Sequence, residues 1–372
     1  MASILMVNIP YAGHTNPTLY LARELVKRGH TVQYVNAPEY ADAIRATGAT
    51  FVPYIHYPDN PRPQQKKMRC FRAAYDTALS IQNKFDLFIY EMFFYPGLRI
   101  AERLQIPCVR QFSQPAWDAS MIDRATPFFR LSCKLIDAQV MGKRNVAYMG
   151  LAHKRMTDAV LYDQPNLNLV YVPEVFQPCR DSFDESYIFA APPFHVPDTQ
   201  SDIPYGDMKR PILYISLGSI ISNRGFCKAC IRAFAHTRFS VILNTGKVEP
   251  ASLGKLPDNI RAYAFVPQIE VLQNADVFLT HCGMNSVNEA ISMGVPMIAM
   301  PFINDQISNA RRITEMGLGV RVRSFPTSAK ALYAAVERVS RDAEIKDNCL
   351  RARRALDPNC FYAAVDRVEA LL

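Results

Sequence analysis

Short apolar runs alternate with helix-like segments along the first third of the chain. Short runs of aliphatic and aromatic residues bounded by turn residues predict buried strands, and apolar positions that recur every three or four residues predict helices. The expected helices include residues 40–47 and 97–104. The expected strands cover residues 4–9, 31–35, 50–54, 86–90 and 106–112. This alternation is typical of a parallel sheet with helical crossovers.

A second series of strand-like runs predicts a second domain of the same kind. Its strands are expected over residues 211–216, 240–243, 261–265, 276–280 and 295–300. Proline, aspartate and serine are frequent just before this series, which marks a linker. We therefore expect an α/β protein with two doubly wound, Rossmann-like domains, 1–195 and 211–355, joined by residues 196–210. Because ligands of such sheets bind beyond the carboxyl ends of the strands, two facing domains would enclose a cleft.

The densest group of candidate ligands follows a predicted strand of the second domain. His281 ends this strand, and a helix-like pattern begins near Asn285. A helix N-terminus carries unpaired N–H groups and about half a positive charge, so a turn containing Gly283, Asn285 and Ser286 can hold a diphosphate. His281 can add a side-chain donor. Glu289, one turn further along, can accept from the hydroxyls of a ribose.

The next predicted helix begins with Asp305 and Gln306, whose side chains offer acceptors and donors for sugar hydroxyls. Each candidate taken alone also has a structural explanation, such as a helix cap for Ser286 or Asp305. The order of diphosphate, ribose and sugar ligands along the chain is what indicates a nucleotide-sugar site.

A candidate base lies near the N-terminus, in the loop after the first predicted strand. Asn16 is expected to cap the following helix, with Pro17 at its first position and Gly29 at its end. His14 then lies at a strand-to-helix switch that faces the cleft. A neutral imidazole, whose ordinary pKa is about 6.5, can take the proton of an acceptor hydroxyl as that oxygen attacks an anomeric carbon. The pattern predicts general-base catalysis by His14.

Composition narrows the function classes. The chain has 372 residues, 49% of them hydrophobic, and no run approaches the roughly 18 apolar residues of a membrane span. Nine cysteines without a framework spacing predict a reducing, cytoplasmic location, and Cys227 and Cys230 are interpreted as structural. The net charge of +8 suits an anionic donor and leaves peripheral membrane contact open. The basic segments are interpreted as solvated surface, so no nucleic-acid partner is expected.

Five segments occur in a characteristic order: 13–17, 216–219, 265–268, 281–289 and 301–306. Together they resemble the nucleotide-sugar-dependent glycosyltransferases of the GT-B fold, in particular the family of bacterial macrolide glycosyltransferases and plant and animal UDP-glycosyltransferases. In that family the first segment carries the catalytic histidine, and the second, which contains Gly218 and Ser219, is the first loop that contacts phosphate. The resemblance covers most of the chain and is tightest over about 210–320.

The resemblance implies a role for each donor-site residue. Phe265 would stack on the base, the backbone of Val266 would pair with it, and Gln268 and Glu289 would hold the ribose. Asp305 and Gln306 would bind the transferred sugar. The expected diphosphate ligands are Ser219, His281, Gly283, Asn285 and Ser286, with Gly218 in the same loop as Ser219.

The family usually pairs its catalytic histidine with an aspartate at the end of the fourth strand. Here that strand ends in Glu91, one methylene longer, and Asp118 is the alternative partner. The family needs no metal, because helix N-termini and His281 stabilise the leaving diphosphate, so no metal and no cofactor besides the donor sugar nucleotide is expected. The last segment, 356–372, is expected to cross back onto the first domain.

The sequence therefore predicts an inverting glycosyltransferase that moves a hexose from UDP-glucose, or alternatively from a dTDP-sugar, to a hydroxyl of a small lipophilic acceptor such as a macrolide or flavonoid. Three alternatives stay open: a membrane-lipid glycosyltransferase, a nucleotide-sugar 2-epimerase, and a non-catalytic auxiliary protein of a partner glycosyltransferase. A monomer and a homodimer are equally open. Residues 54–85 and 112–186 are expected to carry the acceptor pocket, with Trp117, Phe128, Phe129, Met141, Tyr148 and Met149 as apolar candidates.

Overall fold

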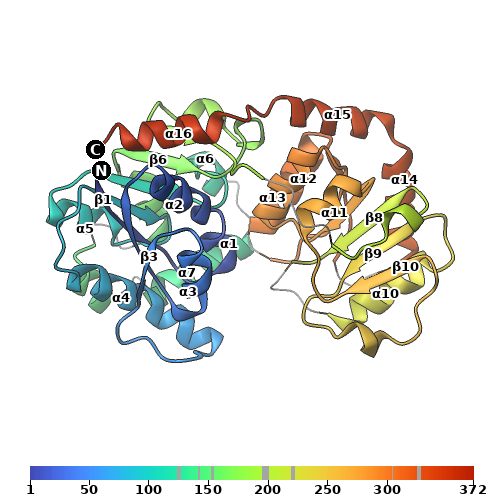
Figure 1. The fold of residues 1–372 in the computed structure, drawn as a ribbon, viewed down its shortest axis with the longest axis horizontal. Helices are drawn as coiled ribbons and strands as arrows, with labels where there is room; N and C mark the ends of the chain where they lie inside the picture. The colour runs from blue at the N-terminus through green and yellow to red at the C-terminus, as the bar shows by residue number, and fades with distance from the viewer. Residues whose placement is uncertain are drawn as a thin grey trace. The chain divides into compact units, whose positions relative to one another are not determined.

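Two parallel sheets organise the chain, one in each of two units (Figure 1). The first unit contains Met1–Pro193 and Pro358–Leu372, and the second contains Phe194–Asp357. The final segment thus belongs to the first unit. The computed structural model describes residues 1–123, 127–140, 143–151, 155–194, 201–218, 223–303, 305–324 and 328–372.

Within the described residues, the sheet of the first unit has seven strands in the order β3-β2-β1-β4-β5-β6-β7, and every pairing is parallel. The strands are β1 (Ser3–Val7), β2 (Thr31–Asn36), β3 (Thr50–Pro53), β4 (Leu87–Glu91), β5 (Cys108–Phe112), β6 (Leu167–Val170) and β7 (Tyr187–Phe189). The first five confirm the predicted series. The last two lie beyond it and were not predicted.

The helices of the first unit are α1 (Ala12–Thr15), α2 (Thr18–Lys27), α3 (Ala41–Arg45), α4 (Pro63–Ser80), α5 (Gly97–Leu104), α6 (Ala119–Asp123), α7 (Pro127–Val140), α8 (Lys143–Tyr148), α9 (Met156–Tyr162) and α16 (Cys360–Glu369). Helix α16 packs against α2 and β7, and its Phe361 and Val365 join the buried core of this unit. His30 contacts both ends of the chain: its Nδ1 accepts from the backbone N–H of Ala2 at 3.2 Å, and its Nε2 lies 2.7 Å from Glu369.

The sheet of the second unit has six strands within the described residues, in the order β10-β9-β8-β11-β12-β13, again all parallel. The strands are β8 (Ile212–Ser216), β9 (Ser240–Asn244), β10 (Ile260–Tyr263), β11 (Val277–Thr280), β12 (Met297–Ala299) and β13 (Gly319–Arg321). The helices are α10 (Arg224–Phe234), α11 (Gln268–Asn274), α12 (Met284–Met293), α13 (Asp305–Glu315), α14 (Ala329–Arg341) and α15 (Ala343–Arg354). The predicted α/β class with two doubly wound sheets is confirmed.

The strand order reverses at corresponding places in the two sheets. In the first, β1 lies between β2 and β4, and in the second, β8 lies between β9 and β11. Ligands of open α/β sheets bind beyond the carboxyl ends of the strands at such a switch point. His14 and Glu91 follow or end the strands at the first switch point, and Gly218 and His281 follow those at the second.

One local prediction was wrong. Asn16 is not the N-cap of the helix after His14, because the chain first forms the short helix α1, which Asn16 ends. Helix α2 begins at Thr18 with Pro17 as its cap residue and makes no side-chain cap bond. Gly29 follows the helix with a φ of 91°, as its predicted role in ending the helix requires.

Candidate active site

The carboxylate of Glu91 lies beside the imidazole of His14. Glu91 is the last residue of β4 and is fully buried, and its Oε1 is 2.7 Å from Nδ1 of His14. The other carboxylate oxygen, Oε2, accepts from the backbone N–H of Phe93 at 2.7 Å. The carboxylate is therefore held from both sides, and its one extra methylene relative to aspartate does not prevent contact with the histidine.

Asp118, the alternative partner, has a different neighbour. Its Oδ1 accepts from the backbone N–H of Ser120 at 2.9 Å and from the Ser120 hydroxyl at 2.5 Å. These hydrogen bonds lower the pKa of Asp118 below its usual range. The structure thus brings Glu91, and not Asp118, to His14.

A buried polar network shapes the turn that carries His14. The side-chain amide of Asn8 donates to the carbonyl of His14 at 3.2 Å, to Thr18 at 3.0 Å and to Tyr34 at 2.8 Å. Asn8 is fully buried just after β1, where unpaired amide groups would be costly. These hydrogen bonds fix the backbone at His14.

Aromatic rings surround the imidazole of His14. The ring centroid of Phe93 lies 5.4 Å from it and that of Tyr11 6.1 Å from it. Trp117 packs edge-on against Phe93, with the centroids 5.6 Å apart. Trp117 is largely buried, so it belongs to the wall behind Phe93. Two aromatic rings thus flank the imidazole whose Nδ1 contacts Glu91.

In the second unit, the imidazole of His281 fits between two glycines. A Cβ added to Gly218 would lie 2.5 Å from Cε1 of this ring, and one added to Gly283 would lie 2.5 Å from Nε2. Gly218 also has a φ of 71°, a conformation that other residues rarely adopt. Both glycines are therefore required by the position of His281.

His281 is buried in a place where its charged form is disfavoured. Its Nδ1 has no hydrogen-bond partner within the described part of the chain, and burial lowers the pKa of the ring to about 4. The next residue, Cys282, is a fully buried non-glycine with a φ of 68°. Asn309 stabilises this unusual turn, because its buried amide donates to the Cys282 carbonyl at 2.9 Å.

Helix α12 begins directly after this turn, with Gly283 as its cap residue. Its first turn contains Asn285 and Ser286, so its N–H groups point toward the switch point of the sheet. An oriented helix N-terminus of this kind favours an anion. The predicted diphosphate ligands His281, Gly283, Asn285 and Ser286 are thus contiguous in the structure. Ser219 lies outside the described residues.

The predicted ribose ligands form one hydrogen-bonded group. The amide of Gln268 donates to the Ser286 hydroxyl at 3.0 Å and to a carboxylate oxygen of Glu289, while its carbonyl oxygen accepts from Tyr214 at 3.0 Å. Burial raises the pKa of Glu289 to about 7. Gln268 and Glu289 are therefore positioned together.

Phe265 follows β10 and is unusually exposed, with 81% of its surface accessible. Its neighbour Val266 is buried and anchors the segment. A large exposed aromatic ring beside the Gln268–Glu289 pair is suited to stacking on a planar base. The family resemblance implies a stacking role for this ring, and that role stays a prediction.

Asp305 and Gln306 begin helix α13, as predicted. Gln306 is buried, and its side-chain oxygen accepts from the backbone N–H groups of Phe302 at 2.9 Å and Ile303 at 3.2 Å. Its amide oxygen therefore stabilises the preceding loop, and the loop is held close to the first turn of the helix.

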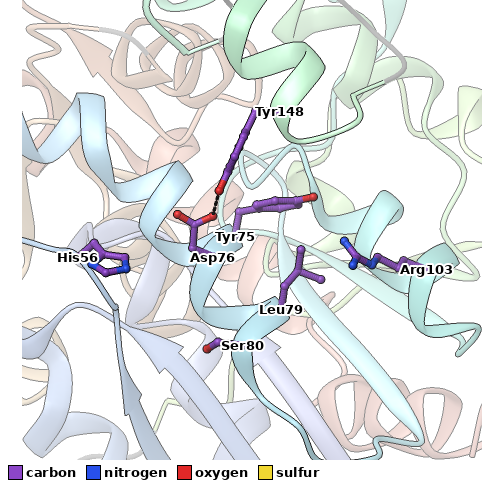
Figure 2. A pocket seen from close by; sticks show the side chains of 7 residues that line it. All are labelled: His56, Tyr75, Asp76, Leu79, Ser80, Arg103 and Tyr148. Atoms are coloured by element: carbon purple, nitrogen blue, oxygen red, sulfur yellow. Dashed lines mark hydrogen bonds between the residues drawn. The ribbon is translucent and has the colours of Figure 1, made fainter.

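A cavity of about 470 Å³ opens in the first unit beside α4 (Figure 2). The Tyr148 hydroxyl donates to Asp76 at 2.9 Å, and the Tyr148 ring lies edge-on to Tyr75. Ser80 ends α4 and Arg103 lies in the last turn of α5, whereas His56 follows the carboxyl end of β3. Its lining residues are His56, Tyr75, Asp76, Leu79, Ser80, Arg103 and Tyr148.

The remaining acceptor candidates are distributed differently. Met149 is buried core, Met141 lies outside the described residues, and the side chains of Phe128 and Phe129 are likewise outside them. No group of three or more potential metal ligands occurs in the described ranges. Helices long and apolar enough to cross a bilayer are also absent from those ranges.

Sequence reasoning missed three residues beside the candidate histidines: Asn8, Asn309, and Ser113, whose hydroxyl oxygen lies 2.8 Å from Nδ1 of His14. Asn8 interrupts an apolar strand run, and Ser113 directly follows a predicted strand next to the one that ends in Glu91. Asn309 lies four residues after Asp305 on the same helix, a spacing that places both on one face. Each of these signals is visible in the sequence, although none identifies the partner of the residue.

Comparisons with known proteins show what this chain is similar to. The sequence model of the UDP-glucoronosyl and UDP-glucosyl transferase family matches residues 205–356. The NDP-glycosyltransferase YjiC of Bacillus subtilis (strain 168) is 32% identical over 364 residues, which is 92% of this chain and 90% of that protein. The oleandomycin glycosyltransferase of Streptomyces antibioticus is 29% identical over all of this chain and 91% of its own length. The crystal structure of the glycotransferase of kitacinnamycin is similar over all of this chain and 99% of that chain, with 29% identity and a TM-score of 0.86.

Proposed function

Because this chain belongs to the family of UDP-glycosyltransferases and bacterial macrolide glycosyltransferases, we propose that it is an inverting enzyme that transfers a hexose from a UDP-sugar to a hydroxyl of a small lipophilic acceptor. Its membership of a nucleotide-sugar-dependent glycosyltransferase family is the premise. The inverting course, the donor sugar, the base and the acceptor class are the proposal.

The proposed reaction is a direct displacement at the anomeric carbon. Nε2 of His14 takes the proton of the acceptor hydroxyl, and the acceptor oxygen uses its electron pair to form the new C–O bond. The bond between the anomeric carbon and the diphosphate oxygen breaks, and UDP leaves with that electron pair. One displacement without an enzyme nucleophile inverts the anomeric configuration.

The 2.7 Å contact between His14 and the buried carboxylate of Glu91 carries this proposal. An ionised carboxylate only accepts hydrogen bonds, so it holds a hydrogen on Nδ1 and leaves Nε2 as the basic nitrogen. It also stabilises the imidazolium that forms after proton transfer. An auxiliary protein would have no need of such a pair, so the contact favours catalysis over that alternative.

The second unit supplies what a departing diphosphate needs. A neutral, buried His281 and the N-terminus of α12 together offer N–H donors. Such fixed donors stabilise developing negative charge without a metal ion. The exposed ring of Phe265 and the Gln268–Glu289 pair are suited to a nucleoside, for which UDP is the proposed identity and dTDP the alternative.

The proposed acceptor is a lipophilic natural product with a hydroxyl group. Phe93 and Tyr11 flank the imidazole of His14, and flat apolar walls favour planar or lipophilic molecules. The relative named for oleandomycin glycosylation supports a macrolide as one class to test, and the aromatic walls support phenols as the other.

The test is release of UDP from UDP-glucose across a panel of phenolic and macrolide acceptors. Wild type should release UDP only when an acceptor is present, and His14→Ala should lose about a hundredfold or more of that rate while still binding UDP. His30→Ala is the matched control, because His30 also contacts a glutamate in the same unit. Equal rates for wild type and His14→Ala would contradict the assigned base. UDP binding without release for any acceptor would favour an auxiliary protein.

A further inference from the structure

A third residue contacts the nitrogen of His14 that Glu91 also contacts. The hydroxyl oxygen of Ser113 lies 2.8 Å from Nδ1, compared with 2.7 Å for the Glu91 carboxylate. Ser113 is buried and directly follows β5. Glu91 on β4 pairs in register with Gln111 on β5, so the two oxygens reach the imidazole from neighbouring strands.

The positions of the hydrogens shared by His14, Glu91 and Ser113 determine whether the Ser113 hydroxyl donates or accepts. In the proposed mechanism Glu91 is a carboxylate, which only accepts hydrogen bonds, so Nδ1 carries the hydrogen that joins them. A serine oxygen can accept from that same N–H in a shared, three-centre hydrogen bond. If the serine hydroxyl instead donated to Nδ1, the hydrogen would move to Nε2, and His14 could not act as the base.

A glutamate side chain has one more rotatable bond than an aspartate, so on its own it fixes an imidazole less firmly. Ser113 restricts the same nitrogen from a second direction. We propose that Ser113 is a positioning residue for His14: its hydroxyl oxygen accepts from Nδ1–H beside Glu91, selects the tautomer that is basic at Nε2, and stabilises the imidazolium after proton transfer. This inference rests on the proposed function.

The test compares Ser113→Ala with Ser113→Thr, which keeps the hydroxyl. The pKa of His14 is measured by NMR titration without substrates, and the His14→Ala spectrum identifies its signal. A hydrogen bond to a charged group is lost only in the alanine variant, so the His14 pKa should fall by about one unit there and stay near the wild-type value in the threonine variant.

The kinetic arm measures acceptor-dependent UDP release as a function of pH. In Ser113→Ala, kcat should fall about tenfold with little change in the KM for UDP-glucose, and the acid limb of the profile should move to lower pH. A structural defect alone would lower kcat without moving that limb. Ser113→Thr should restore both quantities.

Ser120→Ala is the matched control, because Ser120 is another hydroxyl of the same unit that contacts a different acidic residue. UDP affinity and circular dichroism establish that each variant is folded. An unchanged or raised His14 pKa in folded Ser113→Ala would overturn the proposal, as would a folded Ser113→Thr that behaves like alanine. If wild type releases no UDP with any acceptor, the proposed function fails, whereas the NMR comparison still decides the role of Ser113.

Discussion

The two candidate histidines, one in each unit, occupy corresponding places in their sheets and have opposite surroundings. Each follows a strand at the point where the order of its sheet reverses. The side chain of His14 is 22% exposed and contacts the carboxylate of Glu91 and the hydroxyl of Ser113. His281 is buried, lies between two glycines, and has no partner at Nδ1 within the described residues.

The comparison shows that the neighbours of an imidazole, and not its place in the fold, decide its chemistry. A carboxylate beside His14 favours its protonated form, which is what the proposed role as base requires in the transition state. Burial lowers the pKa of the His281 ring to about 4, so this ring stays neutral near pH 7. A neutral ring can still donate one hydrogen bond to a phosphate.

The largest expected effect comes from removing the charge that distinguishes His14. Glu91→Gln keeps the size of the side chain but no longer fixes the tautomer, so kcat for UDP release should fall about a thousandfold, or about 4 kcal/mol in activation free energy. Glu91→Asp should lose less, because it keeps the charge. Steady-state UDP release is the measurement, with Glu369→Gln at the other histidine contact as control. A Glu91→Gln enzyme within threefold of wild type would show that the carboxylate is not needed.

The next effect concerns His281 and stability. Its pKa is about 4 when folded and about 6.5 when unfolded, so between these values the unfolded chain binds a proton that the folded protein does not. The free energy of unfolding should therefore fall as pH drops through this range, by up to about 3 kcal/mol from this residue. His281→Gln should flatten the curve measured by urea unfolding. The other histidines contribute equally to both proteins, so parallel curves would mean that His281 is not buried in this way.

A smaller loss of stability and of UDP affinity is expected when a side chain is added beside His281. In Gly218→Ala the new Cβ would meet the ring at 2.5 Å, and the backbone φ of 71° disfavours a side chain. We expect a loss of about 2 kcal/mol in stability and at least about a tenfold weaker affinity for UDP, measured by calorimetry.

Gly254→Ala separates the effect of contact with His281 from the effect of a positive φ. Gly254 has a φ of 87°, but a Cβ there would have no neighbour within 4 Å. This variant should show only the backbone cost and should bind UDP normally. If both variants bind UDP equally well, contact with His281 has no part in the donor site.

Much of the fold could be predicted because strand and helix patterns alternate clearly around both switch points. The missed strands β6, β7 and β13 have four, three and three residues. Glu91 could be predicted as a partner of His14 from the family resemblance, since it ends the fourth strand, where the family usually has an aspartate. The loop after Asn8 was harder to predict, because the short helix α1 precedes Asn16, which was expected to be an N-cap.

The contacts of Ser113 and Asn309 could not be predicted from local patterns. Ser113 contacts a residue 99 positions away, and Asn309 contacts a carbonyl 27 positions away. Such contacts depend on strand register and on side-chain rotamers, which neighbouring residues in the sequence do not determine. The left-handed conformation of Cys282 could not be predicted either, since non-glycine residues rarely adopt a positive φ.

The smallest effect tests whether that left-handed turn positions His281. Asn309→Ala removes a buried hydrogen bond to the Cys282 carbonyl, worth about 1 kcal/mol, so UDP should bind about fivefold more weakly. Asn274→Ala is a close control, because its amide also donates to a backbone carbonyl at 2.9 Å in the same unit. Both variants should lose similar stability, but only Asn309→Ala should lose affinity in calorimetric titration with UDP. Equal affinities would mean that the turn keeps its shape without Asn309, and that the two glycines alone position the imidazole.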